Sequence, residues 1–94
     1  MIHITERAKE ELKRLLSQKV EWPYARLRLI DRGQEDLGLG IDVEMPGDQV
    51  VEYQGIKILV IEHELAKKVK GITLDVENTA DGPELVLDER TRNI

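Results

Sequence analysis

Cysteine is missing from all 94 positions of this chain. Its absence excludes disulfide bonds, thiol nucleophiles, and zinc or iron–sulfur sites held by thiolates of this chain. Phenylalanine is missing as well, so Trp22, Tyr24 and Tyr53 are the only aromatic residues. Isoleucine, leucine and valine therefore supply almost all of the apolar side-chain volume, which predicts a thin aliphatic core rich in strand-forming residues.

Long apolar runs are also missing. No stretch approaches the roughly 18 apolar residues of a membrane-spanning helix. The opening MIHITERAKEEL has neither the basic nor the apolar region of a secretory signal. We therefore expect a cytoplasmic protein that does not enter a membrane.

An excess of positive charge is lacking too. The formal net charge is −5, and the acidic residues are spread from Glu6 to Glu89, which argues against nucleic acid as a partner. The densest basic cluster consists of Lys67, Lys68 and Lys70, and acidic residues stand just before it. We interpret this cluster as a solvated helix face.

The chain is long enough for one domain, which we expect to span residues 1–94. A domain of this size hides only about 60–65% of the surface that its unfolded chain exposes, so nearly every apolar side chain is needed for the core. Little apolar volume remains to line a deep pocket.

An amphipathic helix is predicted over residues 6–18. Thr5 is suited to cap its N-terminus. The apolar residues recur at helical spacing, which predicts one buried face made of Ala8, Leu12, Leu15 and Leu16. Opposite charges one turn apart are expected to form two ion pairs, Arg7 with Glu11 and Glu10 with Arg14.

The end of this helix is predicted from Pro23, which cannot continue a helix. Trp22 and Tyr24 stand on either side of the proline. We expect their rings to cover the edge of the core rather than to bind a ligand.

Twofold alternation follows the helix. Residues 25–31 and 39–45 alternate apolar and polar side chains, which predicts two strands that pair antiparallel in one sheet. Between them lies DRGQEDLGLG, residues 31–40, which we interpret as a polar hairpin loop. Its glycines, Gly33, Gly38 and Gly40, are expected to let the backbone turn or bulge.

The rest of the chain predicts one hairpin, a short helix and two further strands. The hairpin joins residues 50–53 to the apolar run 56–61, the helix covers 62–70 and stops at Gly71, and the strands cover 72–77 and begin again at Leu85. Residues 2–4 read as an extended lead. These elements predict an α+β fold, mostly antiparallel sheet, with one N-terminal amphipathic helix and one short second helix.

The order of several segments resembles the HesB-like proteins, the A-type carriers of iron–sulfur cluster biogenesis. The resemblance covers nearly the whole chain. It rests on ITERAKEELKRLL at the start, ARLRL before the glycine-containing loop, VVEYQGIKILV, and the short helix that runs into GITLDV. The resemblance implies a HesB-like, β-rich fold and a relation to cluster biogenesis.

The chain departs from the family at its cluster ligands. The carriers have Ser-Gly-Cys-x-Gly in the first loop and Cys-Gly-Cys near the C-terminus, and neither motif occurs here. Counted from LRL, the first thiol position falls near Asp36, with Gly38 in place of the glycine that follows it. The resemblance therefore implies a fold but not cluster ligation.

Other ligand sets are weakly indicated. His3 and His63 are the only histidines, and their spacing forms no ligand pair, so we predict solvent or helix-end roles for both. Asp31, Glu35 and Asp36 supply oxygen ligands suited to a hard cation, but calcium loops need more regularly spaced carboxylates. A polar hairpin loop is the simpler interpretation.

No catalytic motif is visible. Ser17 is the only serine, and neither a nucleophile elbow nor a phosphate-binding loop surrounds it. The adjacent carboxylates of Glu10 and Glu11 do not indicate an acid–base pair. We therefore predict no catalytic, cofactor-binding or metal site, and no cofactor.

Two functional hypotheses remain. The first is a non-enzymatic interaction or accessory protein, related to iron–sulfur cluster biogenesis, that binds a protein partner and cannot ligate a cluster through its own cysteines. The second is a weak binder of iron or another hard cation through the loop carboxylates. The sequence determines neither the partner nor the oligomeric state.

Overall fold

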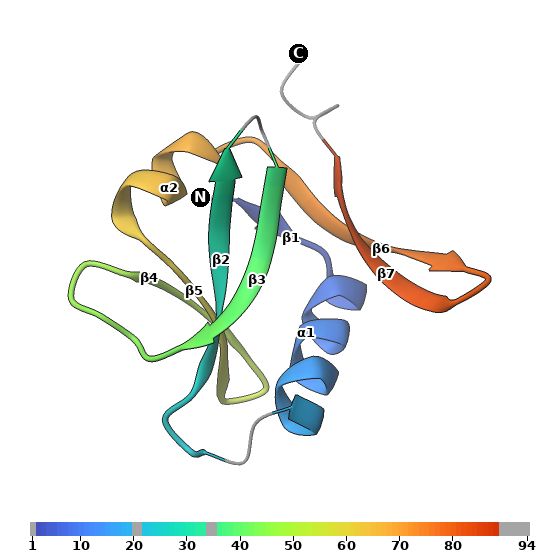
Figure 1. Ribbon diagram of the computed structural model, residues 1–94, viewed down its shortest axis with the longest axis horizontal. Helices are drawn as coiled ribbons and strands as arrows, with labels where there is room; N and C mark the ends of the chain where they lie inside the picture. Colours follow the sequence, from blue (N-terminus) through green and yellow to red (C-terminus); the bar gives the residue numbers. More distant parts are fainter. Residues whose placement is uncertain (1, 20–21, 34–35, 89–94) are drawn as a thin grey trace.

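The computed structural model describes residues 2–19, 22–33 and 36–88, and these contain two helices and seven strands (Figure 1). In chain order the elements are β1 (His3–Ile4), α1 (Glu6–Lys19), β2 (Arg26–Gly33), β3 (Asp36–Asp42), β4 (Gln49–Tyr53), β5 (Ile56–Ile61), α2 (His63–Lys68), β6 (Thr73–Thr79) and β7 (Gly82–Asp88).

The strands form two sheets. The larger has the order β3-β2-β5-β4, in which β2–β3 and β4–β5 are antiparallel and β2–β5 is parallel. The smaller has the order β1-β6-β7, in which β1–β6 is parallel and β6–β7 antiparallel. The predicted α+β fold with mostly antiparallel sheet is confirmed, whereas the two parallel pairings were not predicted.

The core lies where the two sheets and both helices meet. Every element except β3 and β7 contributes buried apolar residues, and those two strands add partly buried leucines. Helix α1 contacts both sheets (Figure 1). The predicted phase of α1 is confirmed, because Ala8 and Leu12 are fully buried while Leu15 and Leu16 pack half-buried against the core.

The N-terminal cap of α1 forms as predicted, but the arginines of the helix pair with other carboxylates than those predicted. The Ala8 N–H donates to Thr5 Oγ1 at 3.2 Å. Arg7 pairs with Asp75 of β6, and Arg14 pairs with Glu11, whereas Arg7–Glu11 and Glu10–Arg14 pairs were expected. Arg14 donates to Glu11 from two nitrogens, Nε and Nη2, which is the stronger bidentate arrangement. Arg7 reaches both carboxylate oxygens of Asp75 from Nη2 alone, at 3.2 and 3.3 Å.

The segment predicted as a loop is mostly strand. Residues 31–33 belong to β2 and residues 36–40 to β3, with Leu29 opposite Leu39 and Asp31 opposite Leu37. The reason is that the alternation of inward leucines continues through Leu37. Residues 34–35 lie outside the described residues.

Two of the three loop glycines make room instead of turning the backbone. A Cβ on Gly38 would lie 2.3 Å from Arg32 Nε, and one on Gly40 would lie 2.6 Å from Ile30 Cδ1. Long side chains of β2 therefore lie across the glycines of β3. Gly33 alone of the three has a positive φ, 86°, and stands at the bulge in the β2–β3 pairing.

Two further predictions are corrected. The strand predicted over 39–45 ends at Asp42, and Ile41 and Met45 are each 51% exposed. Trp22 and Tyr24 do not cover the core, since they are 54% and 70% exposed. Ala25 takes that place: its N–H donates to the Trp22 carbonyl, which closes a turn, and its side chain is buried.

Candidate functional site

Asp36, near which the sequence resemblance places the first thiol of the carriers, lies at the end of the β2–β3 hairpin where β2 leads into β3. Asp36 is the first residue of β3 and is exposed. It borders a hollow of about 380 Å³ between β2–β3 and the β6–β7 hairpin. We call this hollow the leucine groove, because apart from Asp36 and Gly38 it is lined by Leu29, Leu37, Leu39, Leu74, Leu85 and Leu87.

Strand register explains why the leucines gather there. Leu29 and Leu39 are cross-strand partners in the larger sheet, and Leu74 and Leu87 are partners in the smaller one. Strands β3 and β7 are the outer strands of their sheets, so the two sheets part along this side. Leu87 remains 37% exposed, which leaves an apolar surface beside the carboxylate of Asp36.

The carboxylates predicted as oxygen ligands are not gathered into a site. Asp31 Oδ1 accepts a hydrogen bond from the Gly33 N–H at 2.8 Å, and Oδ2 lies 3.7 Å from Lys68 Nζ of α2. Asp31 thus accepts a hydrogen bond at the bulge, and its exposed pair with Lys68 adds little stability. Glu35 lies outside the described residues.

The histidines are equally scattered, with His3 in β1 and His63 at the start of α2, and both are exposed. Within residues 2–19, 22–33 and 36–88, no three histidine, aspartate or glutamate side chains lie close enough to hold a metal ion.

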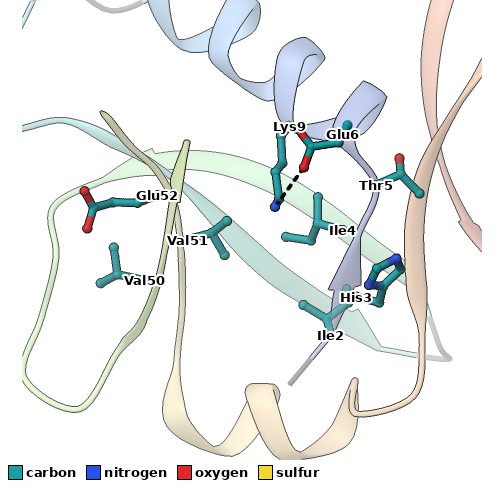
Figure 2. A pocket seen from close by; sticks show the side chains of 9 residues that line it. All are labelled: Ile2, His3, Ile4, Thr5, Glu6, Lys9, Val50, Val51 and Glu52. Atoms are coloured by element: carbon teal, nitrogen blue, oxygen red, sulfur yellow. Dashed lines mark hydrogen bonds and ion pairs between the residues drawn. The ribbon is translucent and has the colours of Figure 1, made fainter. Parts of the chain in front are cut away.

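A second hollow, of about 520 Å³, lies between β1, the start of α1, and β4 (Figure 2). Its apolar wall includes the buried side chains of Ile2, Ile4 and Val51. Its Lys9 and Glu6 pair with each other at 3.4 Å, as the dashed line in Figure 2 shows. Thr5 also lines this hollow, and its hydroxyl donates to Asp75 Oδ1 at 2.8 Å and accepts from the Ala8 N–H, so it serves as the cap of α1.

The best-formed polar cluster holds the β3–β4 connection against the larger sheet. Arg28 Nη2 donates to Asp48 Oδ2 at 2.6 Å and to the Val43 carbonyl at 2.9 Å, and Arg28 Nε donates to Asp42 Oδ2 at 2.8 Å. The side chain of Asp48 is 3% exposed.

The electrostatics of this cluster are reciprocal. Hydrogen bonding to the Arg28 guanidinium lowers the pKa of Asp48 against the opposing effect of burial, and the Met45 N–H lowers it further. The same contact raises the pKa of Arg28. The cluster is structural, because every strong donor in it already has an acceptor. The alternation of the sequence predicted that Arg28 faces away from the core, but it did not indicate which residues Arg28 contacts.

The fold is that of the A-type iron–sulfur carriers. IscA, solved with a [2Fe-2S] cluster, superposes with a TM-score of 0.64 at 21% identity, over 96% of this chain and 86% of that one. Escherichia coli SufA, involved in biosynthesis of iron–sulfur clusters, superposes with a TM-score of 0.61 at 16% identity, over 94% and 79%.

A third solved structure, of a protein from Aquifex aeolicus, has a TM-score of 0.60 at 28% identity and covers 93% of this chain and 89% of that one. No protein-family profile matches the chain, and no curated protein sequence matches it significantly. The resemblance inferred from the sequence is thus confirmed in the fold, in a chain that has no cysteine.

None of the helices in the described part of the chain has the length and apolar character needed to cross a membrane. The sequence did not reveal the leucine groove, because it is made by leucines from both sheets whose mutual placement depends on how the sheets part. The only local indication of the leucine groove was that Leu37 and Leu39 alternate with glycines and so face the same side of the strand.

Proposed function

We propose that this chain is a non-enzymatic accessory protein of iron–sulfur cluster biogenesis, acting in the cytoplasm as a single domain, which binds a protein partner through the leucine groove. It carries no cluster on thiolates of its own. The observation that supports this proposal is the position of the groove: it is bordered by Asp36, near which the sequence resemblance places the first thiol of the carriers.

The chemistry of Asp36 argues against cluster ligation. Iron–sulfur irons are held by thiolates, with histidine as an occasional replacement. A carboxylate is a hard ligand, better suited to hard cations than to a sulfur-bridged iron centre. Asp36 is also exposed and has no cysteine near it, since the chain has none.

The groove has the composition of an interaction surface. Contiguous exposed apolar surface with a polar rim is typical of sites where proteins bind one another. Six leucine side chains from both sheets line the groove, and Asp36 supplies a polar rim. A partner that inserts apolar side chains here would cover Leu87, which is 37% exposed.

Site-specific crosslinking tests the proposal. A photoreactive amino acid at position 87, in the groove, should crosslink the protein in cells to a discrete partner that takes part in cluster assembly or receives clusters. The matched control is position 84, which lies on the same strand outside the groove and is exposed. Equal crosslinking from both positions, or partners unconnected with iron–sulfur proteins, would overturn the proposal.

A further inference from the structure

A second surface, remote from the leucine groove, carries the only tryptophan of the chain. Trp22 and Tyr24 follow α1 and are 54% and 70% exposed. Their rings meet edge to face, with centroids 6.4 Å apart and planes at 76°. Two aromatic side chains that pack on each other while facing solvent are unusual outside interaction surfaces, where Trp and Tyr are enriched.

A small apolar hollow lies beside Trp22. It measures about 210 Å³ and includes Leu16 from the end of α1, Ala25 before β2, and Ile56 at the start of β5. Ile56 is 40% exposed. The hollow has room for a single side chain and Trp22 is among its lining residues, so it is suited to hold one apolar anchor.

Two cations border the same hollow without carboxylate partners. Lys13 Nζ donates to Gln54 Oε1 at 2.7 Å, and Arg26 Nη1 donates to the carbonyls of Pro23 and Ala25 at 3.0 and 2.9 Å. Among the described residues, neither lies in an ion pair. Arg28, two residues after Arg26 on β2, differs from Arg26 because it bonds to two carboxylates.

Arg26 also has an unused donor. Its Nε is buried and has no hydrogen-bond acceptor within the described part of the chain. A buried donor without an acceptor is costly, and an incoming acceptor could relieve that cost only if the Arg26 side chain shifted, because this atom is buried. We call the surface made by Lys13, Leu16, Trp22, Tyr24, Arg26 and Ile56 the aromatic patch.

We propose that the aromatic patch binds a segment of a partner protein in which an apolar side chain stands next to aspartate or glutamate. The apolar side chain enters the hollow against Trp22, and the carboxylate pairs with Lys13 and Arg26. Charge complementarity determines the chemistry of the partner: among the described residues, the lining of the hollow contains two cations and no carboxylate, although the chain as a whole has a net charge of −5. This surface is separate from the leucine groove.

Peptide selection followed by fluorescence titration tests the proposal. A random peptide library displayed on phage should yield, with the intact chain as bait, tryptophan-free peptides that place leucine, methionine or phenylalanine beside acidic residues. Because Trp22 is the only tryptophan, a change in intrinsic fluorescence on titration reports on the patch itself. Enrichment of basic peptides, or no enrichment, would overturn the proposal.

Variants separate the apolar and charged parts of the patch. Trp22→Ala should weaken binding of a selected peptide by about tenfold or more, as for an interface hot spot; since it removes the fluorophore, calorimetry measures it. Lys13→Gln combined with Arg26→Gln should weaken binding similarly and remove its salt dependence. If the double variant does not fold, Lys13→Glu alone should weaken binding of acidic peptides and favour lysine-containing ones.

The matched control is Ile41→Ala, which removes another exposed aliphatic side chain, 51% exposed, outside the patch. It should leave peptide affinity unchanged, and an equal loss would contradict the proposal. Sedimentation distinguishes self-association: a dimer that Trp22→Ala converts to monomer would assign the patch to a second copy and overturn the partner assignment. Crosslinking from position 87 is independent of all these outcomes.

Discussion

Among single residues, the contact between Arg28 and Asp48 is the clearest determinant of stability outside the core. The two side chains are 15% and 3% exposed and meet at 2.6 Å. Asp48→Asn leaves the guanidinium largely buried with one carboxylate fewer. It should lower the free energy of unfolding by about 2–4 kcal/mol, because breaking a buried charged pair costs more than losing an exposed one. Urea denaturation measures this.

Asp42→Asn is the matched control for Asp48→Asn. Asp42 also bonds to Arg28, at 2.8 Å, but is 48% exposed, so its loss should cost less than about 1 kcal/mol. A loss for Asp42→Asn as large as for Asp48→Asn would contradict the stated role of burial.

The pH dependence of the Asp48 contribution has a definite sign. The pKa of Asp48 is lower in the folded protein than its ordinary value, chiefly because the Arg28 guanidinium hydrogen-bonds to the carboxylate. The stabilisation is therefore complete above the unfolded pKa of about 4 and is lost as the pH falls through the folded value. The stability difference between wild type and Asp48→Asn should shrink below about pH 4.

Residue patterns in the sequence could identify which side chains face inward but not which charges pair. Leu27 and Leu29 are buried on β2 as their alternation predicted. The partners of Arg7, Arg14 and Arg28 depend on distances across the fold or on rotamers, neither of which a spacing rule contains. Glu11, 8% exposed on the buried side of α1, is a polar residue that the apolar pattern alone could not place there.

At the scale of elements, the phase of α1 can be measured by mutation. Leu12 is fully buried, whereas Leu15 is half-buried at the margin of the core. Leu12→Ala should lower the free energy of unfolding by about 3–5 kcal/mol, since it leaves a closed cavity. Leu15→Ala should cost clearly less, and thermal or chemical denaturation of both variants provides the comparison. A larger loss for Leu15→Ala would mean that the helix is rotated from its observed phase.

Element boundaries in the glycine-containing segment could not be predicted locally. Three glycines within residues 31–40 are typical of a loop, yet Gly38 and Gly40 lie inside β3. Their role appears only across the hairpin, where Arg32 and Ile30 occupy the space that side chains would need. Tertiary packing overrides strand propensity at these two positions.

At the scale of the whole molecule, the A-type fold and the lack of cysteine lead to opposite expectations about iron. We expect that the absence of thiols prevents the protein from binding an iron–sulfur cluster. Anaerobic incubation with ferrous iron and sulfide should leave the protein colourless after desalting, because the chain offers no thiolate to the cluster. Visible absorption and iron and sulfide assays measure this. A stable brown protein with stoichiometric iron and sulfide would contradict the proposed function.

Asp36→Cys is the informative companion variant. A single thiolate per chain satisfies too few iron positions for a robust cluster, so the variant should also stay colourless. It should fold normally, since exposed positions usually change stability by only about half a kcal/mol. Loss of folding would show instead that the Asp36 carboxylate is structural.

The topology of the whole molecule was predicted only where neighbours in sequence are neighbours in space. The antiparallel pairs β2–β3, β4–β5 and β6–β7 each join consecutive strands. The parallel pairs β1–β6 and β2–β5 join strands far apart in the chain, and no local pattern encodes which distant edge a strand will select. The resemblance to the A-type carriers predicted the fold class, but the two parallel pairings became known only from the structure.

The pairing of β1 with β6 has a consequence for how the chain is made on the ribosome. The His3 N–H donates to the Ile72 carbonyl and the Thr5 N–H to the Leu74 carbonyl, at 2.9 and 3.0 Å. The ribosome synthesises β1 first, and it leaves the exit tunnel long before residues 72–74, with which it pairs. Ile2 and Ile4, buried in the finished protein, can take their places beside β6 only after that strand has been made, so β1 is synthesised well before it can be paired.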